Sequence, residues 1–195
     1  MIKIRRNVFE TNSSSTHSIA IPKDISKDYS GRTVCFSMGE YGWEFDEPDS
    51  ADYLYTAINC FWSSEPDIRE EKLNFLKNAL EKYEINYTMD EVKFEKTWED
   101  EKTGRKYYDP EYGYIDHDHD LGEFLEAVFR DEDTLLSFIF DGLVYTGNDN
   151  SDSLACFPQQ KFDEEYDRKE QKWVQVENEY YDPNSLNFDW YVKGN

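Results

Sequence analysis

The chain has 195 residues and a mass of 23.3 kDa, and 43 Asp and Glu against 21 Lys and Arg give a formal net charge of -22. This acidity argues against an ordinary nucleic-acid-binding domain, which needs a basic surface to neutralise phosphates. Aromatic residues make up 17% of the chain, which argues against disorder and predicts a single folded domain over residues 1–195. No apolar run reaches the roughly 18 residues of a membrane helix, so we expect a cytoplasmic protein without a membrane partner.

The charge is distributed unevenly along the chain. Residues 1–35 contain six basic and three acidic side chains, a net charge of +3, whereas residues 36–195 contain 15 basic and 40 acidic ones, a net charge of -25. The sequence therefore combines a basic N-terminal segment with an acidic body. Three isolated cysteines form no CxxC pair and predict buried thiols rather than a disulfide framework or a zinc site: Cys35, Cys60 and Cys156.

Periodicity and capping signals predict an α+β fold with a mainly antiparallel sheet, about four helices and a C-terminal β-hairpin. Helices are predicted at residues 50–62, capped by Asp49 or Ser50, at residues 66–83, and as two short helices within residues 121–140. Strands are predicted at residues 3–9, 18–21, 33–38, 91–98, 143–146, 173–177 and 188–192. A charged hairpin tip is expected at residues 99–106, a mobile loop at 159–171, and a turn at 182–184 between the last two strands.

The most unusual string is residues 5–18, RRNVFETNSSSTHS, which collects arginines, a carboxylate, amides, hydroxyls and an imidazole. Guanidinium forks and turn amides bind phosphate oxygens, and a Glu–His pair can transfer a proton, so the set suits phosphate chemistry. If residues 3–9 and 16–21 pair as neighbouring strands, Glu10 and His17 flank the intervening loop and face one pocket. The alternative is ordinary turn chemistry, in which Asn and Ser bind local amides and a single His is packed beside a strand.

Metal-independent phosphodiester cleavage needs a base, an acid and a cation for the developing charge. The predicted catalytic residues are Glu10, His17 and Arg6. The predicted substrate-binding residues are Arg5, Asn12, Ser14, Asp149 and Asn150, of which the last two belong to a polar turn at residues 146–152. That turn is otherwise a loop with Asn and Gly in left-handed conformations. The sequence has no Walker loop, dinucleotide fingerprint or G-x-S-x-G elbow, and we expect no cofactor.

A second cluster, DHDHD at residues 116–120, places five potential metal ligands in a row. Its weak candidates for a divalent metal are Asp116, Asp118 and Asp120. The string does not follow the EF-hand pattern, because Gly122 falls at the seventh rather than the sixth loop position and Ala127 stands at the twelfth, where a Glu is required. The alternative is an acidic segment before a helix at Leu121, where negative charge is favourable at the helix N-terminus.

The acidic body carries a binding hypothesis of its own. Carboxylates alternate with Tyr and Trp in three segments, at residues 43–49, 98–114 and 164–189. Spaced carboxylates can imitate phosphates on a basic protein groove, and aromatic side chains supply contact area. The alternative is solubility, which a charged surface provides without any partner.

The string RNVFETNSSSTHS at residues 6–18 resembles the N-terminal signature of small proteins encoded by phages and mobile elements of Gram-positive bacteria, and GNDN at residues 147–150 resembles a second recurrent piece of that group. The group resembles inhibitors of type II CRISPR effectors, some of which are thought to shorten the guide RNA. The positions that this resemblance implicates are Arg6, Glu10, Asn12, Ser14 and His17, followed by Asp149 and Asn150.

Together these observations predict an inhibitor of a host CRISPR effector, cytoplasmic in the bacterial host, whose partner is the effector protein with its guide RNA rather than free nucleic acid. The acidic body would dock on the basic nucleic-acid channel, with or without ribonuclease cleavage of the guide at the N-terminal cluster. Two alternatives stay open: a small enzyme acting on a phosphate- or carboxylate-bearing metabolite, and a phage structural or regulatory protein without chemistry.

Overall fold

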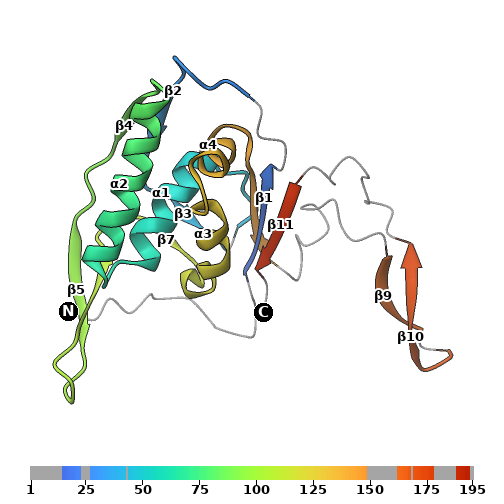
Figure 1. Cartoon of the computed structure of the whole chain (residues 1–195). Coiled ribbons are helices and arrows are strands. Elements are labelled where there is room, and N and C mark those ends of the chain that lie inside the picture. The colour runs from blue at the N-terminus through green and yellow to red at the C-terminus, as the bar shows by residue number, and fades with distance from the viewer. Residues whose placement is uncertain are drawn as a thin grey trace.

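A computed structural model describes residues 15–22, 27–42, 44–148, 162–167, 169–177 and 188–193. These residues form four α-helices, one 3-10 turn and eleven strands, which confirms the α+β fold class (Figure 1). In chain order the elements are β1 (Ser15–Pro22), β2 (Thr33–Phe36), β3 (Glu40–Tyr41), α1 (Ser50–Phe61), α2 (Pro66–Lys82), β4 (Asn86–Met89), β5 (Phe94–Glu99), β6 (Lys106–Pro110), β7 (Tyr114–Ile115), the 3-10 turn (Asp118–Asp120), α3 (Gly122–Val128), α4 (Glu132–Asp141), β8 (Leu143–Asn148), β9 (Phe162–Asp167), β10 (Lys172–Glu177) and β11 (Phe188–Lys193).

The strands form one three-stranded sheet and four pairs. The three-stranded sheet has the order β11-β1-β8 and is antiparallel throughout. Two further pairs, β5–β6 and β9–β10, are antiparallel hairpins, whereas β2–β4 and β3–β7 are parallel. The predominance of antiparallel pairing was predicted. The two parallel pairs were not.

Helix α1 lies at the centre of the core. It begins where predicted, because the side chain of Asp49 accepts a hydrogen bond of 2.9 Å from the amide of Ala51 at the open N-terminus of the helix. Ten of its twelve residues are buried, among them Tyr53, Leu54 and Ile58 at 0% exposure. Figure 1 shows α1, α3 and α4 between α2 on one side and the β1 sheet on the other. Removing one such side chain, as in Leu54→Ala, typically costs about 2–5 kcal/mol.

The pairing of β1 corrects a prediction about the N-terminal segment. From His17 to Ala20 the strand is paired along both edges, with β11 on one side and β8 on the other. The neighbours of this stretch are therefore β8 and β11 rather than residues 3–9, and the shared pocket for Glu10 and His17 was conditional on the latter pairing. Residues 3–9 themselves lie outside the described residues.

The C-terminal hairpin forms from a different pair of strands than predicted. β10 pairs with β9, and β11 pairs with β1 in the central sheet, so β10 and β11 are not partners. β9 lies within residues 159–171, which were predicted to form a loop.

Two smaller results concern cysteines and membrane helices. Cys60 is buried as predicted, but Cys35 is exposed, because the residues of β2 alternate between solvent and the core. Cys156 lies outside the described residues. Within the described part of the chain, no helix is both long and apolar enough to cross a bilayer.

Candidate functional site

His17, the predicted acid or base, is part of the protein interior. Its side chain is 0% exposed, and its Nδ1 shares a hydrogen bond of 2.9 Å with the Oη of Tyr53 on α1. The Tyr53 ring in turn packs against Tyr41 and Phe124, with centroids 5.4 and 6.0 Å away. Burial raises the pKa of Tyr53 well above its ordinary value, so this phenol stays protonated at physiological pH. The geometry is that of a packed polar pair between β1 and α1.

Most of the other predicted site residues lie outside the described residues: Arg5, Arg6, Glu10, Asn12, Ser14, Asp149 and Asn150. The nearest described residues on each side are nevertheless informative. Ser15 is the antiparallel partner of Asn148 at the end of the β1–β8 pairing. The two predicted segments, residues 5–14 and 149–152, are therefore connected to the sheet at the same end.

The DHDHD segment forms a turn before a helix. His117 adopts a left-handed conformation with a φ of 55°, and a 3-10 turn then leads through Leu121 into α3. Among the described residues no group of three or more His, Cys, Asp and Glu side chains could hold a metal ion. The side chain of Asp120 is outside that description. Asp116 and Asp118 thus lie in the segment that leads into α3.

A feature that the sequence alone did not assemble is an acidic surface built from two segments without Lys or Arg. Residues 33–68 contain eight carboxylates and residues 107–129 contain seven, and neither stretch contains a Lys or an Arg. The parallel pairing of β3 with β7 places these two stretches side by side. We call the following residues the acidic surface: Glu40, Glu44, Asp46, Glu47, Asp49, Asp109 and Glu111, which are exposed, with Asp116 and Asp118, which are partly buried.

Glycine permits the close contact between the two segments. Gly42 has a φ of 147°, and a Cβ added there would lie 2.4 Å from the Cβ of Asp116. Two backbone hydrogen bonds fix the register nearby, from the amides of Tyr114 and Asp116 to the carbonyls of Gly39 and Tyr41, both 2.9 Å long. A larger residue at position 42 would push the two segments apart.

The loop that carries Glu44, Asp46 and Glu47 is held by its backbone. The amide and carbonyl of Asp46 exchange hydrogen bonds of 3.1 and 3.0 Å with Thr146 on β8, and the Oγ1 of Thr146 donates to the carbonyl of Glu44 at 3.2 Å. The three side chains of this loop are exposed, and the Oδ1 of Asp46 also accepts a hydrogen bond of 2.9 Å from the amide of Glu47. The acidic loop thus borders the strand that pairs with His17.

Burial and neighbouring carboxylates perturb the groups behind this surface. The pKa of Asp52 is raised, first by burial and then by Asp49 and Asp90, although its Oδ1 accepts a hydrogen bond of 2.7 Å from the amide of Ser37. The pKa of Tyr41 is also raised, first by burial and then by Asp52 and Asp46. Both shifts have the sign expected where negative charge is not offset by cations.

The sequence contained a readable signal for this surface, namely the absence of Lys and Arg over 36 and 23 consecutive residues. Residues 43–49 and 98–114 were predicted as binding segments, but the pairing of β3 with β7 is what brings them close together in space. Each of these strands has two residues and carries no periodic pattern.

Among comparisons with known proteins, no family model matches the chain, and no curated protein or solved structure matches it either.

Proposed function

We propose that this protein inhibits a type II CRISPR effector by docking its acidic surface on the basic channel that holds nucleic acid. The observation that carries the proposal is the side-by-side placement of two Lys- and Arg-free segments at the β3–β7 pair. The choice of effector rests on the resemblance of residues 6–18 and 147–150 to proteins of phages and mobile elements. Together they describe a protein that competes with nucleic acid for a basic site.

The physical basis is charge complementarity. A nucleic-acid channel is lined by Lys and Arg, and a surface that presents only carboxylates satisfies them as phosphates do. For Glu40, Glu44 and Glu47, the described residues supply no ion-pair partner, so docking breaks no internal pair there. Such a surface also accelerates association with a basic partner, and the acceleration weakens as salt is added.

Guide-RNA cleavage is the finer version of the same proposal, with Glu10, His17 and Arg6 as its catalytic residues. The full burial of His17 and its bond to Tyr53 favour docking over cleavage, because a phosphate must reach the imidazole for proton transfer. The shared sheet end of Ser15 and Asn148 supports the idea that the N-terminal cluster and residues 149–150 act together.

The test is a target-cleavage assay with a guide-loaded type II effector from a Gram-positive bacterium. We expect the wild-type protein to inhibit target cleavage while the guide stays intact on a denaturing gel. The variant Glu40→Gln/Glu44→Gln/Glu47→Gln should bind the effector about ten-fold more weakly, since each lost rim charge reduces electrostatic attraction. The matched control Glu70→Gln/Glu71→Gln/Glu81→Gln removes the same charge from α2 and should inhibit like the wild type.

The possible outcomes distinguish docking alone from docking with guide-RNA cleavage. Equal loss of inhibition in both triple variants would show that net charge, rather than the acidic surface, drives binding. A shortened guide that Glu10→Ala or His17→Ala abolishes would establish cleavage instead of simple docking. A wild-type protein that neither binds the effector nor changes its activity would overturn the proposal.

A further inference from the structure

The hairpin formed by β5 and β6 is a second exposed feature, and it extends past the end of α2 in Figure 1. Its tip is a tightly bonded turn. The amide of Gly104 donates to the carbonyl of Asp100 at 2.7 Å, and the carboxylate of Asp100 accepts from the Lys102 amide and the Thr103 hydroxyl at 2.8 and 2.7 Å. The ribbon therefore holds its shape up to the tip.

Contacts with the α1–α2 junction and with α2 hold the hairpin from its base to the start of its tip. Ser64 bonds to both backbone groups of Tyr108, accepting from the amide at 2.8 Å and donating to the carbonyl at 3.3 Å. Arg105 forms an ion pair of 3.2 Å with Glu65, and the guanidinium of Arg69 lies 3.7 Å from the centre of the Phe94 ring. A projection held in this way loses little conformational entropy when it binds a partner.

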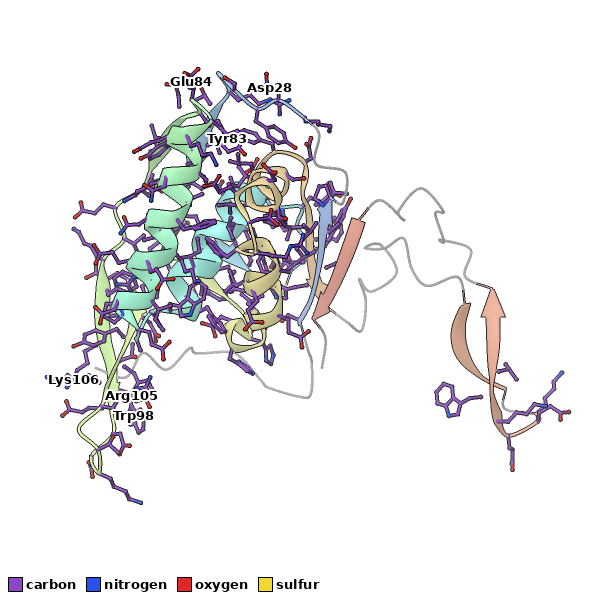
Figure 2. All side chains as sticks on the ribbon, viewed as in Figure 1. Asp28, Tyr83, Glu84, Trp98, Arg105 and Lys106 are labelled. Carbon is purple, nitrogen blue, oxygen red and sulfur yellow. The ribbon has the colours of Figure 1, made fainter. Side chains whose placement is uncertain are left out.

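Trp98 lies on this ribbon with 57% of its surface exposed, and Figure 2 shows it close to Arg105 and Lys106. Its ring is 4.9 Å from that of Tyr107, its cross-strand partner, and the guanidinium of Arg105 lies 5.2 Å from the Tyr107 ring. A bulge between Lys96 and Trp98 brings Trp98 opposite Tyr107. Trp, Tyr and Arg are the residue types most enriched among binding hot spots. Here two rings tilted by 37° and a guanidinium form one preordered cluster, which we call the stack.

The charge of the hairpin indicates which partner this stack fits. Residues 93–108 contain five basic and four acidic side chains, and two of the basic ones, Lys96 and Arg105, form ion pairs with Glu99 and Glu65. Binding of single-stranded nucleic acid requires a clearly positive groove beside the aromatic rings, which this ribbon does not provide. An apolar pocket on a protein is the better match.

The hairpin is also continuous with the acidic surface. β6 contains Asp109 and is followed directly by Glu111, whose amide donates to the carbonyl of Lys93 at 2.8 Å, at the base of the ribbon. A partner that meets these carboxylates with cations therefore lies within reach of Trp98. A basic protein that binds the acidic surface is therefore the partner that the stack can contact.

We infer that Trp98, ordered by Tyr107 and Arg105, is the anchor that this protein inserts into an apolar pocket beside the basic channel of its partner. The inference rests on the proposed function, because the partner is the same effector protein. It adds an apolar contact that does not depend on salt to an electrostatic contact that does.

The experiment measures binding of the guide-loaded effector to the wild type, to Trp98→Ala and to Trp173→Ala at low and high salt. Trp173 is the matched control, because it is 66% exposed but belongs to the β9–β10 ribbon, which Figure 1 draws apart from the other elements. We expect Trp98→Ala to weaken binding about thirty-fold at both salt concentrations, the typical effect of removing a hot spot. Trp173→Ala should bind like the wild type, and Trp98→Phe should restore most of the affinity.

Circular dichroism establishes that each variant is folded, and Trp98→Gln, which should weaken binding as Trp98→Ala does, replaces that variant if it does not fold. Wild-type affinity in Trp98→Ala, together with lost affinity in the acidic-surface triple variant, overturns the anchor and leaves the proposed function standing. Failure of the wild type to bind the effector overturns both. If Trp98→Ala instead reduces binding of labelled single-stranded RNA and not of the effector protein, the stack is a base platform and the inference is wrong.

Discussion

Two regions of this molecule are rich in carboxylates, but only one of them supplies cations. The acidic surface around β3 and β7 is formed by stretches without Lys or Arg. Helix α2 carries four basic and four acidic residues, and the adjoining helix α4 and the segment before β2 contribute further pairs. The ion pairs that the structure describes at this cation-matched end include Lys82–Glu132, Arg130–Asp131, Lys27–Asp141 and Lys72–Glu71.

The difference bears on the choice between solubility and partner binding as the reason for the acidic surface. A mixed surface such as that of α2 keeps a protein soluble while its charges compensate one another. Concentrating carboxylates without cations creates repulsion that has no benefit for folding. Under the proposed function, binding of a basic partner offsets this cost, and variants in the two regions test that explanation.

Among the carboxylates of the two regions, the largest effect on stability is expected for Asp141→Asn at the cation-matched end. Asp141 accepts hydrogen bonds from the Tyr29 hydroxyl at 2.6 Å and from Lys27 at 3.0 Å. Burial acts to raise the pKa of Asp141, but the bonds from Tyr29 and Lys27 outweigh it and lower the pKa below its ordinary value. Loss of a charge-assisted bond should reduce the free energy of unfolding by about 1–2 kcal/mol at pH 7, measured by urea denaturation.

The pH dependence and a control sharpen this prediction. Because the pKa of Asp141 is lowered, its contribution is present above the ordinary carboxyl pKa and is lost as pH falls through the lowered value, so the deficit of Asp141→Asn should close in acid. The pKa of Tyr29 is raised to about 12, mainly by burial, so it remains a donor throughout. Lys27→Gln should cost less than half as much, since Lys27 is exposed. A deficit that persists unchanged at pH 3 would contradict the assignment.

Much of the fold could be predicted from local signals. The Asp49 cap and the apolar spacing of residues 50–62 and 66–83 located α1 and α2 to within one residue, because capping and amphipathic packing are encoded in short stretches. Partner choice was less accessible. A turn signal at 182–184 predicted pairing of β10 with β11, whereas long-range packing pairs β11 with β1.

The candidate site was harder to predict for the same reason. His17 follows a polar string and was expected in a pocket, but both edges of β1 are paired and Tyr53 reaches it from 36 residues along the chain. The charge of the acidic surface is visible in the sequence. Its assembly depends on two-residue strands and on Gly42, whose contact with Asp116 has no sequence signature.

Asp52→Asn, behind the acidic surface, is expected to increase stability, whereas Asp141→Asn decreases it, and the change is expected to be smaller. The pKa of Asp52 is raised, first by burial, so the group favours folding below its ordinary pKa and loses that contribution as pH rises through the raised value. Asn keeps the oxygen that accepts from the Ser37 amide and removes the charge. The variant should be more stable than the wild type at pH 7 by less than about 1 kcal/mol, because the helix dipole at the start of α1 offsets part of the gain.

Urea denaturation between pH 3 and pH 8 measures this effect. The stability gain of Asp52→Asn over the wild type should shrink toward zero in acid. The stability loss of Asp141→Asn should shrink toward zero as well. A loss of stability at pH 7 would mean that the charge of Asp52 is supported, and the two regions would then not differ in the way described.

The smallest expected effect is a change in the free energy of unfolding, which we compare between the two triple variants. Glu40→Gln/Glu44→Gln/Glu47→Gln relieves repulsion and should raise the free energy of unfolding by a few tenths of a kcal/mol at low salt, with the gain disappearing at high salt. Glu70→Gln/Glu71→Gln/Glu81→Gln removes the same charge from α2, where Lys72 lies 3.6 Å from Glu71, and should give no gain. Because both variants change the net charge by the same amount, an equal gain would assign the repulsion to the whole chain. A gain confined to the first variant assigns it to the acidic surface.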